Sequence, residues 1–162
     1  MRLLGSGTIL REVEAAAEIL ENSFDVSSDI WSVTSFNELR REGLDVERWN
    51  RLHPLEQQQQ SFVEQCLPEN GSPVIAASDY IKTYGDQILG FIKDRFTSLG
   101  TDGFGRSDSR EKLRHFFEVD RKFIALAALT ALHERGDIKN TVLAQAIEQL
   151  DINTEKANPA KS

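Results

Sequence analysis

The sequence LLGSGTILREVEAAAEIL, residues 3–20, runs from an apolar pair through a glycine-rich turn into a helical pattern. The apolar pair is typical of the end of a β-strand, and the glycines that follow predict a tight turn. Beyond the turn, apolar residues recur at the spacing of one helix face, at Ile9, Val13, Ala16, Ala17 and Leu20. A strand that leads through a tight turn into an amphipathic helix is the repeating unit of α/β proteins, so this stretch predicts an α/β fold.

Three further segments are predicted as strands, at residues 29–36, 73–77 and 96–99, because they are rich in β-branched, aromatic or other apolar residues. Helical patterns separate them, which predicts a mostly parallel sheet with helices on both faces. The residues therefore predict four strands in all. Only a few residues of the first strand precede Gly5, and a folded domain rarely begins within a strand, so we expect the chain to come from a longer polypeptide.

The segments between the strands carry helical patterns of different kinds. The charged stretch at residues 37–49 predicts a helix that is broken near Gly43. A second helix is predicted through Phe62 and Leu67, and a third over residues 81–92, where isoleucine and tyrosine recur at helical spacing.

The last third of the sequence is predicted to be helical. Asp108, with Glu111 three residues later, fits a capping-box variant at a helix start. Asp120 precedes a long apolar run, and Gly136 stands where that helix should end. The apolar stripe of a final helix is formed by Leu143, Ala146, Ile147 and Leu150.

The composition is that of one soluble globular domain, with 162 residues, 40% hydrophobic and 28% charged. Residues 1–152 are predicted to form this domain, and the polar residues 153–162 a flexible tail. The net charge of -7 argues against nucleic-acid binding and against attraction to an anionic membrane. The single cysteine, Cys66, precludes an internal disulfide, so a reducing cytoplasm is the predicted compartment.

The segment from residue 100 to residue 115 holds the densest set of candidate binding residues. Its glycines and basic residues are Gly100, Gly103, Gly105, Arg106, Arg110, Arg114 and His115. With the hydroxyls and free amides at residues 107–109, these arginines could hold a carboxylate or a phosphate. Alternatively, they pair with neighbouring acids in a structural salt-bridge network or at a subunit interface. The acids are interleaved with the bases, which favours the second interpretation, and they are Asp102, Asp108, Glu111 and Glu118.

The turn at residues 5–8 is a second candidate anion site, because backbone amides open a helix there. It does not match the dinucleotide fingerprint G-x-G-x-x-G, since Leu10 occupies the last glycine position, and the phosphate-binding pattern G-x-x-x-x-G-K-[ST] does not occur. We interpret the segment as a tight turn with a capping hydroxyl.

No other residues form a self-sufficient active site. His53, His115 and His133 lack the spacing of a metal site, so no metal ligand is predicted. Cys66 has no histidine near it in the sequence and is predicted to be an inert, half-buried thiol, while Trp31 is predicted to lie in the core. No serine occupies the nucleophile position of G-x-S-x-G.

Three stretches together resemble one known family. They are LLGSGTILREV at residues 3–13, DIWSVTSF at 29–36 continued by DVERWNRLHP at 45–54, and LGTDGFGRSDSRE at 99–111. They are similar to the C-terminal domain of the homodimeric, bacterial-type first component of the pyruvate dehydrogenase complex. The resemblance covers nearly the whole chain, and its third motif is the most specific. The sequence departs from the family's pattern at residues 55–60 and along residues 81–95.

The resemblance implies a three-layer α/β domain of the transketolase C-terminal type, with about five strands, mostly parallel, an antiparallel edge and helices on both faces. The parent would be a homodimer that uses thiamine diphosphate and Mg²⁺ to decarboxylate pyruvate and to acetylate reductively the lipoyl group of the acetyltransferase component. The ligands of the cofactor and the metal lie in other domains of this family. Asp102-Gly103 is similar to the start of the family's G-D-G cofactor motif, but Thr101 precedes it and no Asn-Asn pair follows. The resemblance therefore implies no catalytic residue, cofactor ligand or metal ligand in this chain.

A supporting role is what the resemblance leaves for this domain: packing against the other domains, extending the dimer interface and shaping the mouth of the active-site channel, with access for the lipoyl arm. The residues expected at the channel or the interface are Asp102, Arg106, Ser107 and Arg110. Two alternatives remain. One is the C-terminal domain of a transketolase or of another 2-oxo acid dehydrogenase, and the other is a stand-alone flavodoxin-like module that holds a phosphorylated ligand at residues 5–8.

Overall fold

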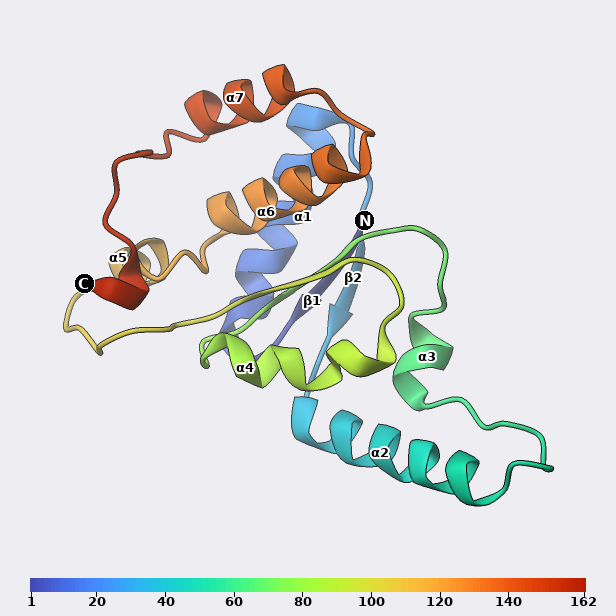
Figure 1. Ribbon diagram of the computed structural model, residues 1–162. Coiled ribbons are helices and arrows are strands. Elements are labelled where there is room, and N and C mark those ends of the chain that lie inside the picture. Colours follow the sequence, from blue (N-terminus) through green and yellow to red (C-terminus); the bar gives the residue numbers. More distant parts are fainter.

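The computed structural model describes residues 1–162, and its centre is a four-stranded parallel sheet (Figure 1). The strands are β1 (Arg2–Gly5), β2 (Asp29–Ser32), β3 (Val74–Ala77) and β4 (Phe96–Leu99). Their order across the sheet is β2-β1-β3-β4, so the first strand lies in the middle. Leu3 of β1 is level with Ile30 on one side and with Ile75 on the other.

The parallel α/β fold and the four strands that the residues predict are confirmed. The count of about five strands with an antiparallel edge, which the resemblance implied, is wrong for this chain, because its sheet ends at β4. After Leu99 the chain enters a glycine-rich loop and then three helices, α5 (Arg110–Phe116), α6 (Arg121–Arg135) and α7 (Asn140–Gln149). None of the connecting segments has the β-branched or aromatic run that an edge strand needs.

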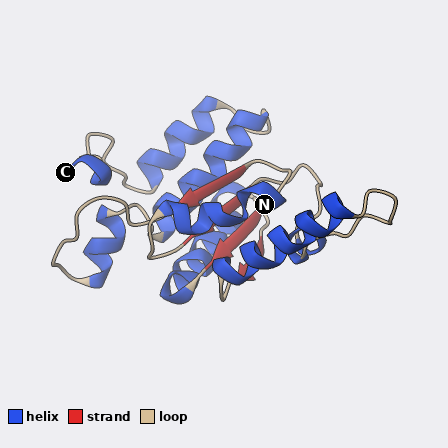
Figure 2. Cartoon of the chain, turned by 60° about the horizontal axis from the view of Figure 1, so that its bottom comes forward, coloured by secondary structure: helices blue, strands red, loops and turns tan.

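Helices cover both faces of the sheet, which makes three layers (Figures 1 and 2). One face is covered by α1 (Leu10–Phe24) with α6, and α7 packs outside them. The other face is covered by α2 (Phe36–Leu52), α3 (Phe62–Cys66), α4 (Lys82–Gly85) and the 3-10 helix η2 (Asp86–Phe91). Two further 3-10 turns are η1 (Gly7–Ile9), which leads into α1, and η3 (Pro159–Lys161).

Two apolar clusters form the core, one on each face of the sheet. Alternate residues of a strand point to opposite faces, so Leu3 and Ile75 join the 15-residue cluster under α1 and α6. Leu4 and Val74 join the 10-residue cluster under α2 and η2. All residues of β1 and β3 are buried, whereas β2 is an exposed edge strand. The central strands are therefore fixed by packing on both sides.

Helix α2 runs without interruption through Gly43, so the predicted break there is wrong. A Cβ atom added to Gly43 would lie 2.4 Å from the ring of Phe91 in η2. The glycine lets the helix approach this ring closely. Gly43 therefore serves the packing of α2 against an aromatic residue that is distant in the sequence. One glycine within a helix destabilises that helix by only about 1 kcal/mol, so the helix continues through it.

Several predicted element ends differ from the structure by a few residues. The predicted strand at residues 29–36 ends at Ser32, because the Ser35 hydroxyl accepts a hydrogen bond from the Glu38 amide and starts α2. Helix α5 is capped by Ser109, and Asp108 instead accepts a hydrogen bond from the Ser109 amide. The helix predicted at residues 81–92 is one α turn followed by η2.

Other local predictions are confirmed. The Asp120 carboxylate accepts hydrogen bonds from the Lys122 and Phe123 amides at the start of α6, and Gly136 ends this helix with a φ of 90°. The tight turn after β1 is present, with Gly7 at a φ of 58°. The capping hydroxyl expected in that turn is absent, because the Ser6 side chain makes no cap hydrogen bond there.

The amino-terminal edge of the sheet is closed by a buried ion pair between Arg2 and Asp94, with side chains only 4% and 6% exposed. Arg2 also donates to the carbonyls of Pro68 and Ser72. Burial acts to raise the pKa of Asp94. Hydrogen bonds from the Asn70 amide, from Arg2 and from the next amide along the chain outweigh burial, so this pKa lies below its ordinary value.

The last ten residues contact the end of α5 and the loop that follows β4. Lys156 donates to the Phe116 carbonyl at 2.6 Å and pairs with Glu118 at 3.0 Å. A Cβ atom added to Gly103 would lie 2.1 Å from the Pro159 carbonyl oxygen. The flexibility predicted for residues 153–162 stays a prediction.

Candidate functional site

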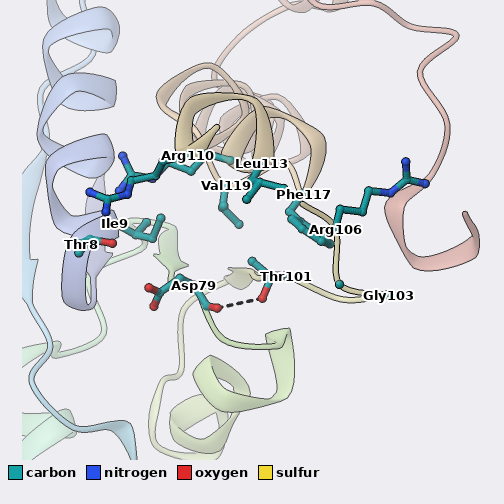
Figure 3. Close-up of a pocket in the computed structure, with 12 residues that line it drawn as sticks. Thr8, Ile9, Asp79, Thr101, Gly103, Arg106, Arg110, Leu113, Phe117 and Val119 are labelled. Carbon is teal, nitrogen blue, oxygen red and sulfur yellow. Dashed lines mark hydrogen bonds between the residues drawn. The ribbon is translucent and has the colours of Figure 1, made fainter. Parts of the chain in front are cut away.

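The carboxyl-terminal edge of the sheet contains a point where the strand order reverses. From β1 the chain passes through α1 to β2 on one side, and from β2 it returns across β1 to β3 on the other side. Ligands of open parallel α/β sheets bind outside the carboxyl ends of the strands at such a point. A cavity of about 460 Å³ lies there (Figure 3).

Three connections and one helix build this cavity. Its walls come from the turn after β1, the segment after β3, the loop after β4 and α5. The polar and flexible lining residues are Thr8, Asp79, Thr101, Gly103, Gly105, Arg106, Arg110 and Arg114. The apolar lining residues are Ile9, Leu113, Phe117 and Val119. The cavity thus combines an apolar floor with a charged rim.

Hydrogen bonds fix the loop after β4 onto the segment after β3. The Thr101 hydroxyl donates to the Asp79 carbonyl at 2.9 Å (Figure 3), and the Thr101 amide donates to the Tyr80 carbonyl at 2.8 Å. The Asp102 carboxylate accepts from the Lys82 amide at 3.1 Å. Asp102 therefore holds two loops together.

The arginines of this region point in different directions. The Arg106 guanidinium lies 4.1 Å from the centre of the Phe116 ring, and its side chain extends away from Asp79 toward the C-terminal segment (Figure 3). The Arg110 side chain extends toward the start of α1, where Thr8 lies (Figure 3). Ser107 is exposed between them. The four predicted site residues thus lie in one loop region but do not converge on one point.

Arg114 is held by Glu12, a buried carboxylate on α1. The Arg114 guanidinium pairs with Glu12 at 2.9 Å, and Arg121 pairs with the same carboxylate at 2.9 Å. Burial acts to raise the pKa of Glu12. Hydrogen bonds from Arg121 and the charges of both arginines outweigh it, so the pKa of Glu12 lies below its ordinary value. This cluster locks α5 and α6 against the first turn of α1.

The predicted salt-bridge network between the loop arginines and their neighbouring acids is wrong. Asp108 pairs with Lys112, Glu118 pairs with Lys156, and Asp102 binds a backbone amide. Glu111 makes no ion pair. These arginines do not pair with the neighbouring acids because of the direction of their side chains. Arg110 and Arg114 lie one turn apart on α5, and both extend toward α1. Sequence reasoning missed Glu12, although a carboxylate between the core residues Ile9 and Val13 was a usable signal.

The turn at residues 5–8 has an acidic neighbour. The Asp79 carboxylate lies 3.7 Å from the position that a Cβ atom on Gly7 would occupy. A fixed negative charge at this distance opposes a phosphate at the turn. The stand-alone module that holds a phosphorylated ligand at this turn is therefore disfavoured.

The remaining candidate residues have structural partners. His53 and His133 bond to the carbonyls of Trp49 and Ile138, and His115 pairs with Asp120 at 2.9 Å. Cys66 is a half-buried free thiol and Trp31 packs against the second core cluster. No group of three or more histidine, cysteine or acidic side chains is arranged to hold a metal ion. None of the helices combines the length and the apolar character that crossing a bilayer requires.

Comparison with known proteins identifies the family. The family model of the transketolase-like TK C-terminal domain matches residues 1–120. The chain belongs to this transketolase-like C-terminal family. The match spans the whole sheet and all of the cavity, whereas α6 and α7 lie beyond it. The family resemblance of the three sequence stretches is thereby confirmed.

Relatives of this transketolase-like domain share one name. This chain is 59% identical over 160 residues to the pyruvate dehydrogenase E1 component of Pseudomonas aeruginosa. It is 52% identical over 159 residues to the protein of that name from Cupriavidus necator, and 50% identical over 160 residues to that from Escherichia coli K12. Each alignment covers 98% of this chain. The chain spans only 18% of the length of each relative.

The residues of this domain do not fit a site for thiamine diphosphate with Mg²⁺. Mg²⁺ in such a site needs oxygen ligands that converge. The one motif similarity, Asp102-Gly103, has its carboxylate bound to the Lys82 amide. No other acidic side chain joins Asp102 in a group that could hold a metal ion. The turn at residues 5–8, where backbone amides could meet a diphosphate, faces the Asp79 carboxylate.

Proposed function

We propose that this chain is the C-terminal domain of a homodimeric pyruvate dehydrogenase E1 component. The parent enzyme decarboxylates pyruvate and reductively acetylates the lipoyl group of the acetyltransferase component, with thiamine diphosphate and Mg²⁺ held by its other domains. The domain described here packs against those domains, supports the dimer and shapes access to the active site. It does not catalyse the reaction alone, and its compartment is the cytoplasm.

The observation that carries this proposal is the 59% identity over 98% of the chain to a protein named pyruvate dehydrogenase E1 component. That relative is more than five times longer, since the chain spans 18% of it. The structure supports a supporting role, because Asp102 and the three histidines are each hydrogen-bonded to other groups of this domain, and Cys66 is a half-buried free thiol.

Exposed apolar side chains at the carboxyl edge of the sheet favour a packing role for that edge. Tyr80 is 59% exposed, Ile81 53% and Phe104 80%. Tyr80 and Ile81 follow β3, Phe104 follows β4, and the two segments are hydrogen-bonded to each other. Large exposed apolar side chains that gather in one place mark interaction surfaces. We infer that the other domains of the parent or the second subunit cover this edge, with Asp102, Arg106 and Ser107 in the adjoining loop and Arg110 at the start of α5.

The loop is tested by Arg106→Ala in the full-length enzyme, with Arg40→Ala on the exposed face of α2 as the matched control. The rate with the lipoyl domain as acceptor is compared with the rate with ferricyanide, which needs no lipoyl access, and dimer dissociation is measured by sedimentation. We expect Arg106→Ala to lower the lipoyl-dependent rate or to weaken the dimer, with the ferricyanide rate unchanged. No change in either quantity would remove the loop from this role.

The wider proposal is tested on the isolated chain by calorimetry with thiamine diphosphate and Mg²⁺, and by a decarboxylation assay with pyruvate. We expect no cofactor binding and no turnover. Saturable binding of the cofactor, or turnover of a 2-oxo acid, would contradict the division of labour proposed here. The full-length enzyme should be active with pyruvate. If it turns over only another 2-oxo acid or transketolase substrates, the chain is instead the C-terminal domain of another 2-oxo acid dehydrogenase or of a transketolase.

A further inference from the structure

The cavity at the carboxyl edge contains one arginine without any partner. Arg110 makes no ion pair and no side-chain hydrogen bond, although its side chain reaches the start of α1 (Figure 3). The other two arginines of the cavity are occupied, since Arg114 pairs with Glu12 at 2.9 Å and Arg106 lies 4.1 Å from the Phe116 ring centre. A single unpaired guanidinium therefore faces this space.

The size and place of the cavity suit a small organic molecule. Its volume of about 460 Å³ falls within the range of small-molecule sites, which is roughly 300–1,000 Å³. It lies where the strand order reverses, between the carboxyl ends of β1 and β3. Its walls come from four segments that hydrogen bonds and the Glu12 cluster hold in place, so the shape exists before a ligand arrives.

The floor of the cavity is apolar. Its accessible surface comes from the half-buried Leu113 and Phe117, because the other two apolar lining residues, Ile9 and Val119, are each only 1% exposed. Covering such a surface with an apolar group is favourable by about 25 cal/mol per Å². The ligand should therefore carry an apolar body that faces this floor.

The charges around the cavity select one negative charge. Arg110 offers the planar fork of donors that a carboxylate accepts in two parallel hydrogen bonds. The start of α1 adds a partial positive charge on the same side. The Asp79 carboxylate makes no side-chain hydrogen bond and lies across the turn, so a second negative charge would be repelled. The balance suits a monoanion better than a phosphate dianion.

We propose that this cavity binds a small monocarboxylate with an apolar body, whose carboxylate pairs with Arg110 at the start of α1 while its body covers Leu113 and Phe117. The proposal rests on the cavity alone and not on the proposed function. It holds for the chain by itself, whichever parent enzyme it belongs to.

The test is a nuclear magnetic resonance titration of the 162-residue chain, with hexanoate as the probe. Hexanamide is the neutral control of the same shape, and inorganic phosphate is the second anion. We expect saturable shifts of the Gly7, Thr8, Thr101 and Gly103 amides with hexanoate, and a Kd of about 1 mM for so small a ligand. Hexanamide and phosphate should bind at least about tenfold more weakly, since one charge-assisted contact is worth about 1.4 kcal/mol or more.

Three variants locate the contact. Arg110→Gln should raise the Kd for hexanoate at least about tenfold, and Arg40→Gln, the same change on the exposed face of α2, should leave it unchanged. Asp79→Asn should lower it, because a like charge is removed. A dispersed spectrum shows that each variant is folded.

Several results would overturn the proposal. Equal binding of hexanamide and hexanoate would mean that the cavity selects no charge. An unchanged Kd in Arg110→Gln, or shifts that never saturate, would mean that the arginine is an ordinary surface residue. Tighter binding of phosphate than of hexanoate would replace the monocarboxylate with a phosphate ligand.

Discussion

The charged side chains discussed at the two ends of the parallel sheet differ in whether they have partners. At the amino end, Arg2 and Asp94 are both nearly inaccessible and are joined to each other and to neighbouring backbone groups. At the carboxyl end, Arg110 and Asp79 face a cavity, and neither side chain has a partner. The same four strands connect the two ends, so the difference lies in the residues at the strand ends and in the segments next to them.

The charges at the amino end therefore contribute to the stability of the fold, whereas those at the carboxyl end stay available for binding. Charges that are buried and mutually satisfied stabilise the fold but cannot meet a ligand without breaking it. Charges left without a partner contribute little to stability and stay available. In parallel α/β proteins the carboxyl end is the end that binds, and the cavity of this domain lies at that end.

Asp94→Asn is the change with the largest expected effect, because it leaves the buried Arg2 charge uncompensated. We expect the free energy of unfolding to fall by about 3–5 kcal/mol, measured by urea denaturation. Asp45→Asn on the exposed face of α2 is the matched control and should change it by less than about 0.5 kcal/mol. An equal effect of the two changes would mean that the amino end is not held by this ion pair.

The same carboxylate predicts the response to acid. Folding lowers the pKa of Asp94 below its ordinary value of 3.8. Its stabilising effect is therefore complete above this value and is lost as the pH falls through the lower pKa of the folded state. The urea midpoint of the wild type should therefore fall as the pH is lowered below about 4, and the Asp94→Asn variant should lack this part of the decline. Glu12, whose pKa is also lowered, adds a decline of the same sign that the variant retains.

Glu12→Gln tests the one satisfied charge cluster near the carboxyl end. Its side chain is 8% exposed, but Arg121 is 50% exposed, so water can replace part of the lost interaction. We expect a loss of about 2 kcal/mol in the free energy of unfolding. Glu14→Gln, on the exposed side of the same helix, is the control and should have almost no effect. If both variants unfold at the same urea concentration, the cluster does not fasten α5 and α6 to α1.

Arg110→Gln should have the smallest effect on stability. It has no partner to lose, so the free energy of unfolding should change by less than about 0.5 kcal/mol. Arg114→Gln, one turn further along α5 and paired with Glu12, should cost about 1.5 kcal/mol. Thermal or urea unfolding of the two variants side by side gives the comparison. A larger loss for Arg110 than for Arg114 would reverse the assignment of binding and structural roles.

Elements whose signals are local were predictable from the sequence. The turn after β1, the Asp120 cap and the Gly136 stop all depend on groups within four residues of each other. The continuous α2 was not predictable, because the reason for Gly43 is the ring of Phe91 in a different element. The number of strands was also predictable, because the local patterns gave the four strands of the sheet and the fifth was implied by the resemblance alone.

The candidate site was predictable in its location but not in its pairings. The turn after β1 and the loop rich in glycine and arginine after β4 were both candidate sites, and both line the cavity, whereas Asp79 after β3 was not singled out. The partner of Arg114 was not predictable, since Glu12 lies 102 residues away in the chain. The acidic residues interleaved in the loop suggested a nearer partner for Arg114. The direction of α5, which extends Arg114 toward α1, shows why these acids do not pair with it.

Helix α6 shows that the family boundary and the folding unit differ. The family model ends at residue 120, yet seven of the 15 residues in the first core cluster lie beyond it, at Ile124, Ala125, Ala128, Leu129, Ala131, Ala146 and Leu150. They cover the apolar side of α1. A chain cut after residue 120 would leave Val13, Ala16 and Leu20 in water, and burial of such side chains is worth about 1.5–3 kcal/mol for the larger ones. Recombinant versions of this domain should therefore extend through Leu150, because a shorter one would aggregate before any ligand could be tested.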